Sequence, residues 1–167
     1  MIETSFRCGS CAQDHAGPPF SYGSDAPAVW SDQFAADDDS ELGDERCVIR
    51  GEHFFVRARI LIPVVDADTT FDWGVWTTLS EPNYRRMTEL WTTEGREREP
   101  HYFGWLSTDL PGYEPSTLWL KTHVVTQPVG ERPILRLEPT DHPLAVEQRE
   151  GITTARVREF AELLLHV

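Results

Sequence analysis

The sequence predicts an α+β domain, in which a mixed, mainly antiparallel sheet packs against about three helices and carries a small N-terminal CxxC knuckle. Residues 53–64 alternate apolar and polar side chains with period two, which is typical of a half-buried strand. Three later segments carry helix-start residues, and two of them continue with apolar residues at helical spacing. Near the N-terminus, Cys8 and Cys11 are separated by two residues, as in many zinc-binding turns.

A chain of 167 residues is long enough for one domain with a sizeable core. We expect a single domain over 1–167, made of an N-terminal arm (1–16), an irregular segment (17–46) and a core of strands and helices (47–167). Part of the irregular segment, residues 35–45, is acidic and is expected to be a solvated, mobile loop. Four aromatic residues predict that the rest of this segment packs on the domain: Phe20, Tyr22, Trp30 and Phe34.

The chain has 15 basic and 28 acidic residues, which gives a formal net charge of −13. This charge repels phosphate backbones and anionic lipid headgroups, so it argues against nucleic acid or a membrane as a partner. It favours a cationic protein or a small-molecule ligand, although acidity can also serve solubility alone. The composition indicates no oligomeric state.

The first residues do not form a basic start followed by an apolar run, and no window has the ~18 apolar residues of a membrane-spanning helix. We therefore expect a cytoplasmic protein. The odd number of cysteines, three, argues against the disulfide framework of a small secreted domain.

Cys8 and Cys11 are the first candidate site, because Gly9 between them supplies the backbone freedom that a metal-binding turn needs. A structural zinc ion takes four ligands, so His15 and Cys47 are the candidates that complete it. Two alternatives stay open. Cys8 and Cys11 could be a redox pair, or all three cysteines could be incidental, with Cys47 a small buried apolar residue.

The long strand, residues 53–64, is the centre of a predicted antiparallel meander. Its apolar side chains lie on one face, whereas Arg57 and Arg59 lie on the other. Turns at 50–52 and 66–68 connect it to a strand on each side.

The helix after the meander is capped by Ser80, with Pro82 in its first turn. The charged run 95–100 ends this helix and is expected to be a solvated loop. Its apolar stripe consists of Tyr84, Met87, Leu90 and Trp91.

Further strands are predicted at 101–106, 118–127 and 134–137, the last two antiparallel to each other. Gly104 in the first of them permits close approach by another backbone or a ligand. A short helix to Glu150 follows, capped at residue 140 or 141 and ended by a glycine. The last helix starts at residue 153 or 154 and carries the stripe Val157, Phe160, Leu163 and Leu164.

Several short strings together resemble one family. They are Phe6-x-Cys8-x-x-Cys11 with His15, Cys47-Val48-Ile49, His53-Phe54-Phe55-Val56-Arg57, Phe71-x-Trp73-Gly74-Val75-Trp76, Tyr102-Phe103-Gly104-Trp105-Leu106 and Glu138-Pro139-Thr140-Asp141-His142-Pro143-Leu144-Ala145. This combination is similar to the bacterial domain-of-unknown-function family 2199. The resemblance implies a bacterial single-domain protein, and it implies no reaction.

The best candidate for catalysis is His142, which follows Asp141 and lies four residues after Glu138. A histidine beside a carboxylate at a helix start could be a general base, or equally a structural cap whose ring bonds to the backbone. Neither a nucleophile elbow nor a His-Glu-x-x-His helix is present. A metal- or His-dependent, hydrolase-like enzyme is therefore the alternative hypothesis.

Binding is the main hypothesis. Arg57 and Arg59 could hold an anionic group, and Trp73, Trp76 and Trp105 could form an aromatic cleft, although large aromatic residues more often belong to the core. We predict a zinc-stabilised binding or interaction module for a protein partner or small ligand. An immunity-type protein that neutralises a basic partner is a further alternative, based on charge alone.

Overall fold

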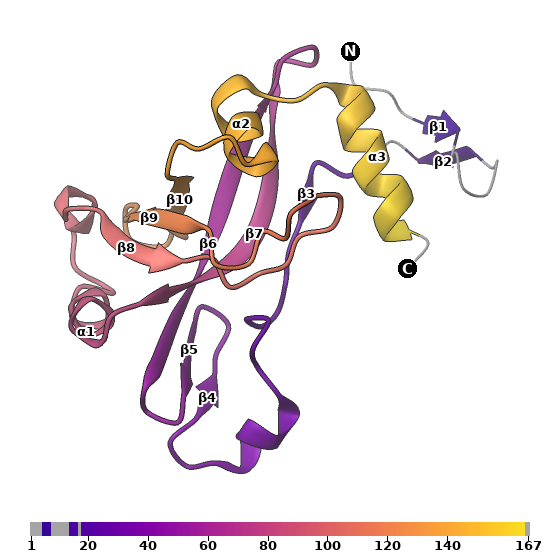
Figure 1. The fold of residues 1–167 in the computed structure, drawn as a ribbon. Coiled ribbons are helices and arrows are strands. Elements are labelled where there is room, and N and C mark those ends of the chain that lie inside the picture. Colours follow the sequence, from indigo (N-terminus) through magenta and orange to yellow (C-terminus); the bar gives the residue numbers. More distant parts are fainter. Residues whose placement is uncertain (1–4, 8–13, 17, 166–167) are drawn as a thin grey trace.

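The computed structural model describes residues 5–7, 14–16 and 18–165. This part of the chain forms three α-helices and a mixed, mostly antiparallel sheet, which confirms the predicted α+β class (Figure 1). The predicted CxxC knuckle is not supported, because Cys8 and Cys11 lie outside the described residues. No helix in the described part is long and apolar enough to cross a membrane.

The predicted meander is present as β5 (Arg46–Ile49), β6 (His53–Val64) and β7 (Thr69–Leu79), paired antiparallel in that order. Arg50 and Gly51 both have positive φ, 56° and 65°, which is the backbone of a type I′ hairpin turn. The apolar side chains of β6 at alternate positions are buried, so the period of two did identify the core face.

The sheet has the strand order β3-β7-β6-β10-β9-β8. β10 is parallel to β6 and β3 is parallel to β7, while β9 is antiparallel to both β8 and β10, as predicted for β9 and β10. The strand predicted over 118–127 is shorter than expected. The bounds are β3 (Ser21–Tyr22), β8 (Tyr102–Trp105), β9 (Lys121–Val125) and β10 (Ile134–Leu137).

The sheet curls until its end strand β8 meets β7 again. Leu106, which follows β8, forms an antiparallel bridge with Thr77, and the Ser107 amide donates to the Trp76 carbonyl at 2.8 Å. A Cβ atom at Gly104 would collide with the carbonyl oxygen of Thr78. The close backbone approach predicted at Gly104 is thus confirmed, and glycine is required there.

The three helices are α1 (Glu81–Glu89), α2 (Pro143–Glu150) and α3 (Thr154–Leu165). Ser80 caps α1 as predicted by accepting from the Asn83 amide. The cap of α2 is His142 instead of residue 140 or 141.

Two apolar clusters form the core. The larger cluster lies between the sheet and the helices and includes Trp73 and Phe160, which contact each other edge to face. The smaller cluster contains Cys47 and Trp76, and Trp30 and Phe34 pack on it. The irregular segment therefore covers the second face of the meander, as its aromatic residues predict.

The acidic segment 35–45, predicted to be a solvated loop, contains no buried residue, although part of it has regular structure. It contains the end of a 3-10 helix (Asp32–Ala36) and the short strand β4 (Glu41–Leu42), which pairs with β5. The Ser40 hydroxyl accepts from the Arg50 amide at 2.8 Å, which ties the segment to the hairpin turn. Composition alone did not show these long-range bonds.

Candidate functional site

A hollow with a volume of about 540 Å³ lies over the polar face of β6. Three arginines, two glutamates and one tryptophan dominate its lining, and we call it the arginine-lined cavity. Its lining residues are Glu45, Arg59, Trp91, Arg96, Gly130, Glu131 and Arg132.

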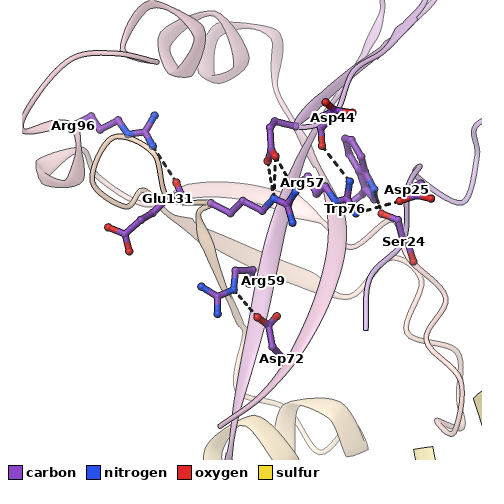
Figure 2. Close-up of polar contacts among 11 residues, drawn as sticks. Ser24, Asp25, Asp44, Arg57, Arg59, Asp72, Trp76, Arg96 and Glu131 are labelled. Carbon is purple, nitrogen blue, oxygen red and sulfur yellow. Dashed lines mark hydrogen bonds and ion pairs between the residues drawn. The ribbon is translucent and has the colours of Figure 1, made fainter. Parts of the chain in front are cut away.

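Arg96 builds one wall of this cavity from beneath the surface, where its side chain is only 8% exposed. Its guanidinium donates to the backbone carbonyls of Trp91 (2.8 Å), Gln127 (2.8 Å), Pro128 (3.0 Å) and Glu131 (3.0 Å), the last of which is drawn in Figure 2. It thereby fixes the 127–131 turn against the segment that follows α1.

The prediction that 95–100 is a solvated loop was wrong for Arg96. Gly95 has a φ of +86° and starts a 3-10 turn, Arg96–Arg98, whose first side chain points inward. The sequence does not distinguish Arg96 from the exposed charged residues around it, because three of its carbonyl partners are about 30 positions away.

Arg59 and Arg132 are each held by one carboxylate. Arg59 donates from Nε to Asp72 at 2.6 Å (Figure 2), and Arg132 donates to Glu45 through Nε and Nη2 at 2.8 and 2.9 Å. The hydrogen bond to Glu45 raises the pKa of Arg132 above its ordinary value. β6 and β10 bring the two arginines together, because the Arg59 amide donates to the carbonyl of Pro133.

Trp91 separates the arginine-lined cavity from a second hollow. Arg46 stacks on the Trp91 ring with its guanidinium carbon 4.2 Å from the ring centroid. The second hollow is more acidic and is lined by Glu41, Gly43, Asp44, Glu45, Arg46, Val48, Tyr84 and Trp91.

Arg57, the other arginine predicted to bind an anion, does not line this cavity. It donates to Asp25 at 3.4 Å and to the Asp44 carbonyl at 3.3 Å, and it lies over the Trp76 ring (Figure 2). The Trp76 ring nitrogen itself donates to the Ser24 carbonyl. Arg57 therefore ties the irregular segment to the sheet.

The three tryptophans predicted to form a cleft are not grouped together. Trp73 and Trp76 are buried, one in each apolar cluster, whereas Trp105 is 40% exposed. The core interpretation thus holds for Trp73 and Trp76, which are buried on opposite faces of β7.

Trp105 instead belongs to a group of exposed aromatic side chains, Phe103, Trp105 and Trp119, which we call the aromatic surface. Phe103 and Trp119 are 39% and 54% exposed. Phe103 and Trp105 contact edge to face with centroids 5.1 Å apart. Their cross-strand neighbours on β9 are His123 and Lys121.

Trp119 stands between two hollows and lines both. One hollow, of about 290 Å³, also contains Trp105 and Glu138. The other, of about 310 Å³, also contains Phe34 and Glu52. Trp119 has a φ of +69°, a conformation that is strained for a bulky residue.

Sequence reasoning missed Trp119 as a site residue. A signal was present, because Trp119 alternates with Lys121 and His123 and so shares the polar face of its segment. A tryptophan in register with polar side chains is expected to be exposed.

His142 is the N-cap of α2 and is almost buried. Its Nδ1 accepts from the Leu144 amide at 3.1 Å, and its Nε2 lies 2.9 Å from the Pro115 carbonyl, which makes Nε2 the donor. Glu138 pairs with His123 at 3.2 Å instead. The described contacts therefore bring His142 together with neither Asp141 nor Glu138, and they match the structural-cap alternative.

Cys47 is 1% exposed, and its burial among apolar side chains raises its thiol pKa to about 12. A zinc ligand must be a thiolate, so this environment favours the interpretation of Cys47 as a small apolar residue. β5, which holds Cys47, lies far from the β1–β2 pair (Ser5–Arg7 and Asp14–Ala16) that contains His15 (Figure 1). Among the described residues, no group of three His, Cys, Asp or Glu could hold a metal ion.

Glu147 on α2 is a partly buried carboxylate. It accepts from Arg156 of α3 at 3.1 Å and from the Tyr113 hydroxyl at 3.2 Å. Burial raises the pKa of Glu147 above its usual range, although Arg156 opposes the shift. The Trp73 ring nitrogen donates to the same Tyr113 hydroxyl, so the network joins both helices to the core.

A family model described as "Uncharacterized protein conserved in bacteria (DUF2199)" matches residues 7–152. No curated protein and no solved structure matches the chain.

Proposed function

The chain belongs to this uncharacterised bacterial family, and from that premise we propose that it is an interaction module that binds a basic segment of another protein on the aromatic surface. The observation that carries the proposal is Trp119. This residue is more than half exposed, has a strained backbone and stands between two hollows.

A strained, exposed tryptophan points to binding because both properties cost stability. A positive φ at a bulky residue costs roughly 1 kcal/mol or more, and exposed indole leaves apolar area in water. Tryptophan is also among the residues that contribute most to binding at protein interfaces. Together with Phe103 and Trp105, Trp119 forms a contact area of the kind that marks interaction sites.

Charge selects the kind of partner. The protein has a net charge of −13, which attracts basic partners and repels acidic ones. Each hollow beside Trp119 contains a glutamate, Glu138 on one side and Glu52 on the other. A basic segment could stack a Lys or Arg on the indole and place neighbouring side chains in the two hollows.

The test is a selection from a random peptide display library on the wild-type protein. We expect the selected peptides to be enriched in Lys and Arg, and to bind Trp119→Ala at least tenfold more weakly in fluorescence anisotropy. Val65→Ala, which shortens an exposed apolar side chain on another part of the surface, is the matched control and should bind normally. Raising the salt concentration should weaken binding. Peptides without basic enrichment, or equal affinity for Trp119→Ala, would contradict the proposal.

Zinc binding remains a separate proposal for the N-terminal arm, with Cys8, Cys11 and His15 as ligands. Cys47 is the weakest candidate for the fourth ligand, because its burial opposes the thiolate form. Elemental mass spectrometry of untagged protein tests this. We expect about one zinc per chain, lost in Cys8→Ser and retained in Cys47→Ala.

A further inference from the structure

We propose that the arginine-lined cavity binds an oxyanion, a carboxylate or phosphate group of a small molecule, through Arg59 and Arg132. This site is separate from the aromatic surface, since the cavity shares no lining residue with the two hollows beside Trp119.

Three arginines and two glutamates line the cavity, in a chain with 28 acidic and 15 basic residues. Asp72, which is bonded to Arg59, adds a third carboxylate, so acidic and basic groups are balanced in number there. The arginines are therefore gathered at this hollow against the overall composition, and we expect their free donors, not a net positive field, to hold the ligand.

Arg59 has donors to offer a ligand. Its Nε is bonded to Asp72, whereas Nη1 and Nη2 have no hydrogen-bond partner in the part of the chain that the structure describes. The side chain is 40% exposed, so these donors face the open cavity. Asp72 thus orients the guanidinium and leaves its outer edge for a bidentate oxyanion.

Arg132 repeats this arrangement. Glu45 occupies its Nε and Nη2, and within the described residues Nη1 has no partner. Both arginines are held on the protein side by a carboxylate, which reduces the entropy lost when a ligand binds.

Arg96 adds positive charge beneath the cavity. All four of its hydrogen bonds go to backbone carbonyls, and no carboxylate of the described residues forms an ion pair with it. Carbonyl dipoles satisfy its donors without cancelling its full charge. A cavity of about 540 Å³ is large enough for a small metabolite, and Trp91 offers the apolar part of that ligand a wall.

Isothermal titration calorimetry at low ionic strength tests the site, with inorganic phosphate and succinate as probes and succinamide as the uncharged analogue of succinate. We expect phosphate or succinate to bind with a Kd of about 1 mM or tighter, and succinamide not to bind. Binding of phosphate alone or succinate alone would support the site and identify the group that it prefers. Binding of neither at about 10 mM, or equal binding of succinamide, would overturn the proposal.

Two variants with opposite expected effects separate binding from structure. Arg59→Gln should weaken binding roughly tenfold or more, because two charge-assisted donors are lost. Asp72→Asn should strengthen binding several-fold, because it removes a competing negative charge while its amide oxygen can still accept from Arg59 Nε and hold the guanidinium in place. The control is Arg85→Gln, which makes the same charge change on α1 outside the cavity. Thermal denaturation confirms folding, and an Asp72→Asn protein that binds no tighter than wild type would overturn the assignment of Arg59.

Discussion

Replacing Arg96 with methionine keeps a side chain of similar length but removes every donor. Among the described residues, the carbonyl groups of Trp91, Gln127 and Glu131 would then have no donor, whereas that of Pro128 would keep the Glu131 amide. A hydrogen bond from a charged donor contributes about 1.5 kcal/mol at the low end, so four such bonds would contribute about 6 kcal/mol if none were replaced. Water from the adjacent cavity can reach some of the carbonyls, so we expect a loss of about 3 kcal/mol in the free energy of unfolding.

Urea denaturation followed by tryptophan fluorescence measures this loss, which should lower the midpoint without changing the slope m. In a domain of this size the Tm should fall by about 10 °C. The matched control is Arg98→Met, two residues further along the same 3-10 turn but exposed, for which we expect a change within about 0.5 kcal/mol. If Arg96→Met costs less than about 1 kcal/mol, the four bonds do not hold the turn in place.

Four further predictions concern other parts of the fold. Gly104→Ala should lower the free energy of unfolding, measured in urea, by roughly 3 kcal/mol, because the added Cβ would collide with a carbonyl of β7. Gly23→Ala is the control, since its Cβ would make only an ordinary van der Waals contact. Equal losses in the two variants would refute the close approach at Gly104. In a Cys8→Ser/Cys11→Ser background, the Cys47 thiol should react with Ellman's reagent only after denaturation, and fast reaction of the native protein would contradict its burial. The pKa of the Cys47 thiol is about 12 in the folded state, which exceeds its unfolded value, so the unfolded state loses the thiol proton first as pH rises. The free energy of unfolding should therefore fall above about pH 9, and Cys47→Ala should reduce that fall. Because the pKa of Glu147 is raised by folding, the folded state binds more protons than the unfolded state at pH values between the two pKa values, and the free energy of unfolding should fall as pH rises through that range. Glu147→Gln should reduce this pH dependence in urea denaturation. An unchanged pH dependence would contradict the raised pKa.

The meander could be predicted from sequence because burial of one face of a strand requires apolar and polar residues to alternate along the chain. β6 shows this directly, with buried residues at alternate positions and Arg57 and Arg59 between them. Ser80 was equally predictable, since a cap depends on neighbours within four residues.

Arg96 was not predictable in the same way, because three of its four partners lie about 30 residues further along the chain. His142 was predictable in part. Its bond to the Leu144 amide is local and was one of the two hypotheses, whereas the Nε2 partner lies 27 residues before it. Trp119 was predictable in part. Its position among polar residues indicated that its side chain is exposed, whereas its positive φ depends on the path of the surrounding loop.

The curled sheet has a consequence for self-association. The end strand β8 is bridged to β7 just beyond its last residue, and the other end strands of the described sheet, β3 and β4, have two residues each. Such short edges offer almost no unpaired backbone for another strand to extend, so they protect against edge-to-edge aggregation. If the aromatic surface binds a basic segment as proposed, we therefore expect recognition through side chains and not through an added strand.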